Sequence, residues 1–321
     1  MHKIPVGVLG ASGYAGRELC AIIARHPGLA LAWASANSQR GETVTLPLGG
    51  EVTFVATEDV RLSDAALIFS ALPHGTSAEW VTRARAAGAK VVDLSNDLRI
   101  GSPKGDGIPY GLTEWQRDLI AGADCVANPG CYPTATLLGL LPLLERDLIA
   151  PGATVQVSAA SGVTGAGLSA RLDLLYGEVS ENFRAYGVGN THRHLAEMRA
   201  TVQAFGVDAD LLFTPHLLPA ARGLLATITV PLRSALSDPA ALWHARYGRE
   251  SFVEVTEALP ELRQVQHRNV ARIAVRGVAE IRTPTLQIFC AIDNLVKGAA
   301  GQAVQNANLM LGLAEAAGLP S

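Results

Sequence analysis

The amino-acid sequence predicts an α/β protein with a Rossmann-type, doubly wound parallel sheet and an α+β domain whose sheet is mixed and largely antiparallel. Three observations predict this architecture. The chain opens on a short apolar segment that leads through a glycine-rich turn into a helical segment. Short apolar segments then alternate with helical ones as far as residue 130. Beyond that point the apolar segments are longer and alternate with polar residues, a period typical of strands with one buried face.

Composition limits the class of protein. The 321 residues suffice for about two domains, and 49% hydrophobic with 17% charged residues indicates a globular chain. A formal net charge of -3 gives no reason to expect nucleic acid or a membrane surface as a partner, and no apolar run reaches the roughly 18 residues of a membrane span. No secretory signal pattern and no paired cysteine spacing is present. We therefore expect a cytoplasmic protein with four free cysteines and no metal site.

The first strand is expected at residues 4–9 and the first helix at 17–26, with a glycine-rich loop between them. This loop, Gly-Ala-Ser-Gly-Tyr-Ala-Gly, is a variant of the dinucleotide-binding pattern. Its glycines allow a tight turn and close approach to a pyrophosphate, which then lies at the helix N-terminus. Such turns also occur without a ligand, but the strand–loop–helix setting favours a cofactor. The expected contacts are Gly10, Ser12, Gly13, Tyr14, Ala15 and Gly16.

The loop after the second expected strand, residues 29–34, bears on which nicotinamide cofactor binds. NAD-binding chains usually carry an acidic residue there for the ribose 2′-hydroxyl. This chain has Ser35, Ser38 and Arg40 instead, and its first carboxylate is Glu42. Hydroxyls and an arginine suit a 2′-phosphate, so NADP(H) is favoured over NAD(H). An ordinary polar loop explains the same residues equally well.

Two further strands are expected at residues 65–71 and 90–94, with a crossover helix at 77–87 that Gly88 closes. Ligands of parallel sheets bind at the carboxyl ends of the strands. Pro73, after the earlier strand, is therefore a candidate cofactor contact, and Arg99, after the later one, is a candidate anion-binding residue. A solvated surface charge is the alternative for Arg99.

The segment Asn-Pro-Gly-Cys-Tyr-Pro-Thr, residues 128–134, is the strongest chemical signal in the chain. A strand expected at 123–127 stops before it, and a helix expected at 134–144 follows it. Cys131 therefore lies near a helix N-terminus, where the dipole and unpaired N–H groups stabilise a thiolate and lower the pKa of the thiol. A buried structural cysteine is the alternative, but the turn chemistry favours a nucleophile.

In the second half, a strand expected at 155–160 leads to Ser161 and a glycine-rich loop. Residues 224–232, 270–278 and 285–292 have the pattern of strands with one covered face. No internal repeat is present.

A helix is expected to begin at Thr191 and to run to about Phe205, with His194 and Glu197 one turn apart. His192 and His194 would then point in different directions, which makes a poor metal site. A solvent-facing histidine is the alternative for His194, but the neighbouring Arg193 and the reactive cysteine favour acid–base chemistry.

The tail begins with Asp-Asn-Leu-Val-Lys-Gly, residues 293–298, at the end of a strand, and continues as a small-residue helix to about Leu313. Asn294 is a candidate cofactor contact. The helix could return to pack on the first domain, or it could be a plain C-terminal helix.

These motifs together resemble N-acetyl-γ-glutamyl-phosphate reductases of the longer type, within the aspartate-semialdehyde dehydrogenase superfamily. The resemblance covers essentially the whole chain. The segments that carry it are residues 10–16, Leu-Ser-Asn-Asp-Leu-Arg at 94–99, residues 128–134, His-Arg-His at 192–194 with Glu197, and residues 293–298.

The resemblance implies an activity and an organisation. The activity is NADPH-dependent reduction of N-acetyl-γ-glutamyl phosphate to N-acetylglutamate 5-semialdehyde, with release of phosphate, through a Cys131 thioester in arginine biosynthesis. His194 would be the acid–base residue. It further implies NADP(H), a homodimer or homotetramer, an NADP-binding domain at residues 1–130 plus 297–321, and a catalytic and oligomerisation domain at 131–296. The residues expected around the substrate are Arg99, Ser161, Arg193 and Glu197.

The chain also departs from the family pattern. Thr164 stands where a second serine is expected, and Leu168 where a basic residue is usual; Asn96 and Leu98 replace a more familiar Ala and Phe. The acyl group of the substrate therefore stays open. A reductase of carrier-protein-linked aminoadipyl or glutamyl phosphate is the nearest alternative. Aspartate-semialdehyde dehydrogenase is disfavoured by the His-Arg-His segment, and an NADP(H)-sensing regulator is the non-enzymatic alternative.

Overall fold

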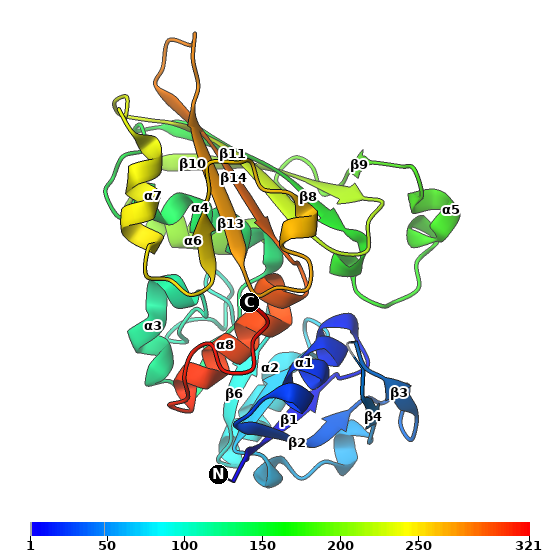
Figure 1. Cartoon of the computed structure of the whole chain (residues 1–321). Coiled ribbons are helices and arrows are strands. Elements are labelled where there is room, and N and C mark those ends of the chain that lie inside the picture. Colours follow the sequence, from blue (N-terminus) through cyan, green and yellow to red (C-terminus); the bar gives the residue numbers. More distant parts are fainter. Residues whose placement is uncertain (1, 48) are drawn as a thin grey trace. The chain divides into compact units, whose positions relative to one another are not determined.

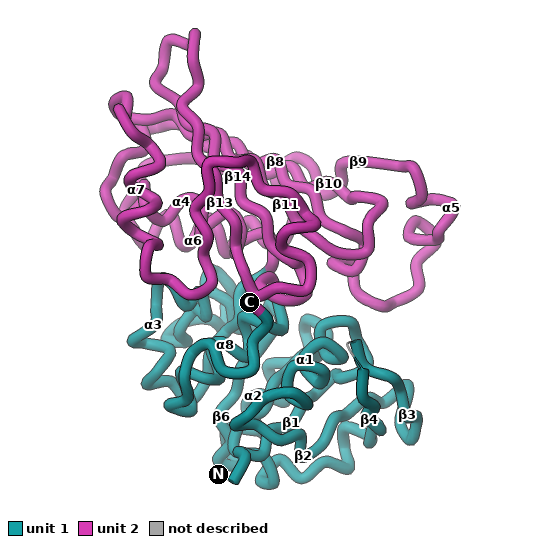
Figure 2. Tube along the Cα trace, viewed as in Figure 1, with its two compact units in different colours: residues 1–130, 299–320 teal, residues 131–298, 321 magenta. Residues whose placement is uncertain are grey.

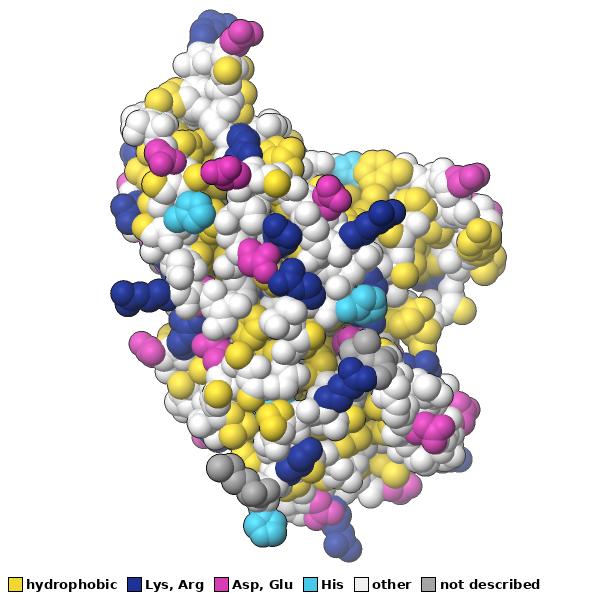
Figure 3. Space-filling view, viewed as in Figure 1, with side chains coloured by type: hydrophobic (Ala, Val, Ile, Leu, Met, Phe, Trp, Pro, Cys, Tyr) yellow, Lys and Arg dark blue, Asp and Glu magenta, His cyan; other side chains and the backbone are white. Residues whose placement is uncertain are grey.

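The computed structural model describes residues 2–47 and 49–321. The chain forms two compact units, one of residues 1–130 with 299–320 and the other of residues 131–298 (Figures 1 and 2). Lysine and arginine side chains are interspersed with aspartate and glutamate over the face drawn in Figure 3. Among the described residues, no helix is both long enough and apolar enough to cross a bilayer.

The first unit contains the predicted parallel sheet. Five strands pair in the order β2-β1-β5-β6-β7, and every pair is parallel. The strands are β1 (Ile4–Leu9), β2 (Leu29–Ser35), β5 (Leu67–Ser70), β6 (Lys90–Asp93) and β7 (Cys125–Ala127). The central strands are buried, as their continuous apolar sequence predicts. A small hairpin of β3 (Thr43–Thr45) and β4 (Glu51–Thr53), which the sequence did not predict, stands beside this sheet.

The helices of the first unit include the last one of the chain. They are α1 (Tyr14–Arg25), α2 (Ser77–Ala86), α3 (Thr113–Ala121) and α8 (Gly301–Met310). A π-helical turn, Val296–Ala300, precedes α8. Helix α8 packs against α3, and its Asn306 accepts a hydrogen bond from Thr113 Oγ1 and donates to the carbonyl of Gly111 and to Asn128 Oδ1. The polar side chains of α8 are thus buried with partners rather than solvated.

The second unit contains a seven-stranded mixed sheet, as predicted, in the order β12-β13-β14-β11-β8-β10-β9. β8–β10 and β12–β13 are parallel pairs, and the other pairs are antiparallel. The strands are β8 (Ala153–Gly162), β9 (Arg184–Ala185), β10 (Ala209–Leu218), β11 (Leu224–Pro231), β12 (Val253–Val255), β13 (Ala271–Gly277) and β14 (Thr285–Ile292). In β11 the burial alternates strictly along the strand, so one face is covered.

Helix α4 (Cys131–Leu144) covers this sheet, and all its residues after Cys131 are buried against β11, β14 and neighbouring helices. Pro142 lies inside the helix and cannot donate to the carbonyl of Leu138 one turn earlier. The Tyr247 hydroxyl donates to that carbonyl instead, at 2.6 Å, and Trp243 Nε1 donates to the carbonyl of Gly139 at 3.1 Å. Both side chains come from α7 (Pro239–Tyr247), which therefore fixes the helix that begins with Cys131.

The remaining helices of the second unit are α5 (Tyr176–Val179) and α6 (Leu195–Ala204). The sequence placed the start of α6 at Thr191, which is wrong by four residues. Asn190 adopts the left-handed region at φ 61°, and His192 Nδ1 accepts the N–H of His194 at 3.2 Å. This turn competes with the helical hydrogen bonds, so His192 and Arg193 precede the helix and His194 is its N-cap residue.

Candidate active site

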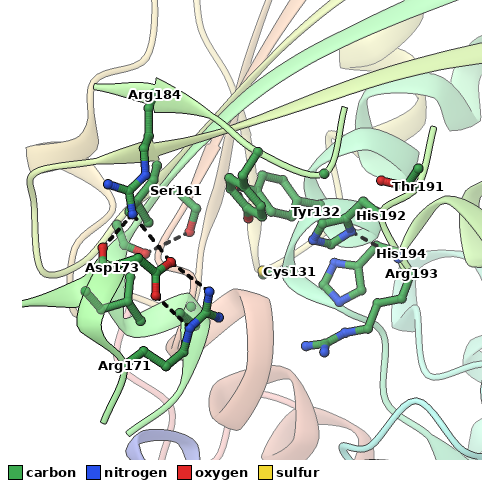
Figure 4. Close-up of a pocket in the computed structure, with 17 residues that line it drawn as sticks. Cys131, Tyr132, Ser161, Arg171, Asp173, Arg184, Thr191, His192, Arg193 and His194 are labelled. Atoms are coloured by element: carbon green, nitrogen blue, oxygen red, sulfur yellow. Dashed lines mark hydrogen bonds and ion pairs between the residues drawn. The ribbon is translucent and has the colours of Figure 1, made fainter. Parts of the chain in front are cut away.

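A cavity of about 360 Å³ in the second unit gathers four of the six residues that the sequence assigned to catalysis and substrate binding (Figure 4). Cys131, Ser161, Arg193 and His194 all line it. The segments that reach the cavity are the start of α4, the end of β8, the loop that follows β8, the turn before α6, and β9 with its neighbour β10. The other residues that line the cavity are Tyr132, Gly162, Gly165, Ala166, Arg171, Asp173, Leu174, Arg184, Tyr186, Gly187, Thr191, His192 and Leu217.

Cys131 is the first residue of α4, as the sequence predicts for a residue at a helix N-terminus. The chain has three other cysteines, and all four are free thiols, but only Cys131 is partly exposed. Burial raises the pKa of Cys20 and of Cys125 to about 12, and it also raises the pKa of Cys290. Those three thiols are therefore protonated and inaccessible, which leaves Cys131 as the one accessible thiol.

The backbone of Gly298 lies against the β-carbon of Cys131. A Cβ on Gly298 would lie 2.8 Å from that atom, closer than real side chains approach. Gly298 belongs to the π-helical turn Val296–Ala300, and its N–H donates to the carbonyl of Asp293 at 2.9 Å. Only a residue without a side chain leaves Cys131 where it is.

His192 and His194 come together because neither is in the helix. Their ring centroids are 4.8 Å apart, and the Tyr132 ring lies 5.5 Å from His192 and 6.0 Å from His194. The sequence-based argument that the two imidazoles point apart is therefore wrong. Among the described residues, no cluster of three or more His, Cys, Asp or Glu side chains could hold a metal ion.

His192 is held as a neutral imidazole. Burial and, to a smaller extent, the nearby charge of Arg193 lower its pKa from 6.5 to about 4. Because Nδ1 accepts the N–H of His194, the ring proton belongs on Nε2. His192 therefore supports the turn that carries His194 without adding a charge to the cavity.

The lowered pKa of His192 predicts how the free energy of unfolding changes at acid pH. Between pH 6.5 and 4 the unfolded chain binds a proton at His192 and the folded chain does not, so stability falls as the pH is lowered through this window. His192→Gln should remove that part of the loss, which is at most about 3 kcal/mol. Urea unfolding of both proteins from pH 7 to pH 4 measures the difference. His244→Gln, at an exposed position on α7, is the control, and equal pH profiles for wild type and His192→Gln would contradict the argument.

Two tyrosine hydroxyls provide neutral polar groups in the cavity. The hydroxyls of Tyr132 and Tyr186 lie 2.9 Å apart, and Tyr132 also donates to the carbonyl of His216 at 3.2 Å. Burial raises the pKa of Tyr186 to about 12 and raises that of Tyr132 as well, with the charge of Cys131 contributing to both shifts. Both groups therefore keep their protons and stay neutral, with Tyr132 donating to the His216 carbonyl and Tyr186 donating to Tyr132.

Glu197 and Arg99 do not line the cavity. Glu197 is 1% exposed in the first turn of α6, and Arg99 is 5% exposed in the first unit. Arg99 Nε donates to the carbonyl of Asn128 at 2.8 Å, and its Nη2 donates to the carbonyl of Leu94 at 2.7 Å. Arg99 thus braces the loop that leads to Cys131, and its role toward substrate stays a prediction, as does that of Glu197.

Sequence reasoning missed the charged group Arg171, Asp173 and Arg184, which also lines the cavity. Arg171 forms a two-pronged pair with the Asp173 carboxylate, from Nε at 3.0 Å and from Nη2 at 2.7 Å. Arg184 lies 3.5 Å from the same carboxylate. The segment between β8 and β9 has no periodic pattern, so only the pairing of β9 with β10 shows that these residues return to the cavity.

In the first unit, the glycine-rich loop forms the turn that a dinucleotide requires. Gly10 has φ +72°, and a Cβ on Gly16 would lie 2.5 Å from the carbonyl oxygen of Gly10, so both positions need glycine. A Cβ on Gly13 would meet only that oxygen, at 3.8 Å, so the loop is open on this side, where α1 begins. An open backbone cradle at a helix N-terminus fits a pyrophosphate.

The side chains around the end of β2 differ in their exposure to a ligand. Ser35 is completely buried, and its Oγ accepts a hydrogen bond from Thr57, so this hydroxyl supports the strand end rather than facing a ligand. Ser38 and Arg40 are exposed. Arg17 of α1, which the sequence reasoning missed, donates from Nε to the carbonyl of Ser12 and from Nη2 to Gln39 Oε1. Arg17 therefore links the glycine-rich loop to the loop after β2.

The other two candidate cofactor residues occupy tightly held loops. The loop that contains Pro73 is joined to the loop after β6, because His74 Nδ1 accepts the N–H of Asn96 at 2.9 Å. In the second unit, Asn294 accepts the N–H of Gly223 at 2.8 Å and donates to Thr164 Oγ1 at 2.9 Å. The Asn294 amide thus pins the loop after Ser161, and contact of Pro73 or Asn294 with a cofactor stays a prediction.

Comparisons with known proteins agree with this fold and site. Residues 5–123 match the semialdehyde dehydrogenase NAD-binding domain, and residues 131–294 match the semialdehyde dehydrogenase dimerisation domain. Aspartate semialdehyde dehydrogenase II from Vibrio cholerae superposes with a TM-score of 0.79 at 20% identity, over 97% of this chain and 99% of that one. The structure of the enzyme from Candida albicans gives 0.70 at 15% identity, over 97% and 99%. The chain therefore has both domains of the semialdehyde dehydrogenase family, whose members are oxidoreductases with a nicotinamide cofactor.

Relatives of higher identity narrow the family. N-acetyl-gamma-glutamyl-phosphate reductases from Halorhodospira halophila and Citrifermentans bemidjiense are 42% and 41% identical, each over 98% of this chain and 98% of the relative. The chain belongs to the N-acetyl-gamma-glutamyl-phosphate reductase family.

Proposed function

We propose that the protein reduces N-acetyl-γ-glutamyl phosphate to N-acetylglutamate 5-semialdehyde, with NADPH as reductant and release of phosphate, in arginine biosynthesis. The observation that carries this proposal is the shared cavity of Cys131, His194 and Arg193, at the start of a buried helix. The relatives named above are reductases of this acyl phosphate. We further propose that the enzyme is cytoplasmic, because its accessible thiol must stay reduced.

The residues of the cavity supply the covalent chemistry. The Cys131 thiolate attacks the γ-carbonyl carbon, the bond to the phosphate oxygen breaks, and a thioester with free phosphate results. A reduced nicotinamide cofactor, held by the glycine-rich loop and the N-terminus of α1, would supply the hydride for reduction of this thioester. His194 donates a proton to the oxyanion and takes it back when the carbon–sulfur bond breaks and the aldehyde leaves. Arg193 stabilises the negative charge of the leaving phosphate.

The glycine-rich loop and the N-terminus of α1 would hold the pyrophosphate of the cofactor, and Arg17 supports NADP(H) over NAD(H). Within the described residues, Arg17 Nη1 has no protein hydrogen-bond partner, and Gln39 stands between Arg17 and Glu42, to which it donates at 2.8 Å. The carboxylate of Glu42 therefore does not neutralise the guanidinium directly. A guanidinium beside the end of β2 suits a 2′-phosphate, together with Ser38 and Arg40.

Arg17→Gln should weaken NADPH binding about tenfold or more and leave NADH binding nearly unchanged, because only the phosphorylated ribose needs the charge. Fluorescence titration of the protein with each nucleotide measures this without turnover. Arg25→Gln, at the exposed end of the same helix, is the matched control. Equal weakening of both nucleotides would show that Arg17 merely supports the loop.

The match to a dimerisation domain supports a homo-oligomer. Large hydrophobic side chains gather on the segment that contains α5 (Figure 3), where Leu172 is 83%, Tyr176 86% and Phe183 57% exposed. Apolar surface of this kind is typically covered by a partner, and we propose that a second copy of the chain covers these three side chains and leaves Arg171 and Asp173 open to the cavity. Sedimentation equilibrium should therefore show a dimer or tetramer, and Tyr176→Glu should shift it toward monomer.

The proposed activity is tested by oxidation of NADPH with N-acetyl-γ-glutamyl phosphate generated in the cuvette. Turnover of the free small molecule would confirm the proposal. Turnover only when the acyl phosphate is attached to a carrier protein would assign the chain to the carrier-dependent reductases instead. Nucleotide binding without turnover of either substrate would favour a regulator.

A further inference from the structure

We propose that Arg171 and Arg184, arranged around Asp173, form the subsite that binds the α-carboxylate of the substrate. This inference rests on the proposed function and assigns an end of the cavity that the mechanism does not use. Figure 4 shows Cys131 between two groups of side chains: Arg171, Asp173 and Arg184 with Ser161 on one side, and the imidazoles with Arg193 on the other.

The backbone holds Arg184 at the cavity. Arg184 lies in β9, where it pairs with Leu217 of β10, and Leu217 also lines the cavity. Its guanidinium donates to the carbonyl of Asp173 and, at 3.4 Å, to the carbonyl of Glu178. Through these hydrogen bonds Arg184 holds the loop that contains Arg171 and Asp173. The guanidinium groups of both arginines therefore lie beside the Asp173 carboxylate.

The positive charge of Arg171 and Arg184 is only partly neutralised by Asp173. Two arginines and one aspartate leave one net positive charge, because Arg171 keeps Asp173 ionised by lowering the pKa of its carboxyl. An anionic ligand would balance that charge. The planar fork of a guanidinium fits a carboxylate by two parallel hydrogen bonds, the geometry that Arg171 already makes with Asp173.

The internal pair can be opened by a ligand. The side chains of Arg171 and Asp173 are 55% and 49% exposed, and ion pairs exposed to that extent contribute little to stability. A substrate carboxylate can therefore replace Asp173 on Arg171 without a large cost. In the ligand-free protein Asp173 acts as an internal stand-in for that carboxylate and competes with it.

The substrate has two anionic ends that match the two groups of side chains. Its reacting carbonyl carbon must lie at Cys131, with the phosphate on the side of the cavity that holds Arg193. Its α-carboxylate lies at the other end of the carbon chain, so it extends away from the sulfur. Arg171 with Arg184 is the cation group on the opposite side of Cys131 in the same cavity.

The test is a set of steady-state measurements on the full-length enzyme. Arg171→Gln and Arg184→Gln should raise KM for the acyl phosphate about tenfold or more with kcat nearly unchanged, because the carboxylate is held equally in the ground and transition states. Asp173→Asn should lower KM, because the competing carboxylate is gone. The α-methyl ester of the substrate should be a poor substrate of the wild type, and Arg171→Gln should reduce this discrimination.

The control is Arg233→Gln, which breaks a surface pair outside the cavity in which Arg233 Nη2 donates to both carboxylate oxygens of Asp147, and which should leave KM unchanged. A rise in KM for Asp173→Asn similar to that for Arg171→Gln would show that the pair is merely structural and would overturn the proposal, as would equal use of acid and ester by the wild type. Wild-type enzyme without any turnover would refute the proposed function itself, so the two failures are distinguishable.

Discussion

Replacing Cys131 with serine should lower kcat by about 10⁴-fold or more while NADPH binding stays unchanged. The hydroxyl of serine is protonated at neutral pH, and no thioester can form, so the covalent route is lost. Coupled NADPH oxidation measures the rate, and fluorescence titration measures nucleotide binding. The cradle for the nucleotide is formed by the glycine-rich loop of the first unit, which does not include Cys131.

Cys125→Ala is the control for this experiment. Cys125 is 5% exposed in β7, six residues before the nucleophile, and its removal should leave kcat near the wild-type value. Iodoacetamide should inactivate the wild type and Cys125→Ala at the same rate and leave Cys131→Ser unmodified at the active site. Substantial turnover by Cys131→Ser would contradict the role of the sulfur.

Substituting Gly298 by alanine should lower kcat about a hundredfold, because the added Cβ forces Cys131 to move and small displacements of a nucleophile cost that much. The new carbon would lie 2.8 Å from the Cys131 Cβ, and it would also lie 3.2 Å from the carbonyl oxygen of Asp293 and from the Ile292 side chain. The turn is closed on three sides, so relaxation must involve the helix that begins at the cysteine.

Gly277→Ala is the matched control, since a Cβ there meets nothing within 4 Å. Both variants should fold, as near-native thermal unfolding would show, but only Gly298→Ala should lose activity and react more slowly with iodoacetamide. Wild-type alkylation and turnover in Gly298→Ala would mean that the turn yields without moving the sulfur.

Much of the fold could be predicted because local signals and tertiary structure agree. The strand, glycine loop and helix at the start of the chain are present, although α1 begins at Tyr14 rather than Arg17. The helix of the nucleophile begins at Cys131, three residues earlier than its apolar run suggested. The strand at 285–292 has the predicted bounds. In each case the hydrophobic period and the turn residues favour the same structure.

The elements that were missed lack such agreement. Strand β10 contains Pro215, which argues against a strand in sequence reasoning, yet it pairs along its whole length with β8. Helix α7 carried a usable signal that was overlooked, because Asp238 caps it through the N–H of Ala241 and Pro239 follows the cap.

The residues of the candidate site likewise divide into those that the sequence indicated and those that it did not. Cys131 and His194 were singled out from motifs, and Ser161 and Arg193 from the family resemblance; the structure brings all four to one cavity. The group of Arg171, Asp173 and Arg184 could not be found, because the two-residue strand β9 that returns it to the sheet has no periodic signal. Arg17 was overlooked because an arginine in the first turn of a helix is usually solvated.

The covalent intermediate can be observed directly. Wild-type protein mixed with N-acetyl-γ-glutamyl phosphate in the absence of NADPH should release one phosphate per site, and intact-mass analysis should show one acyl group, located by peptide mapping on Cys131. Addition of NADPH should remove the adduct as aldehyde. An adduct on another residue, or an unchanged adduct in the Cys131→Ser protein, would contradict the account.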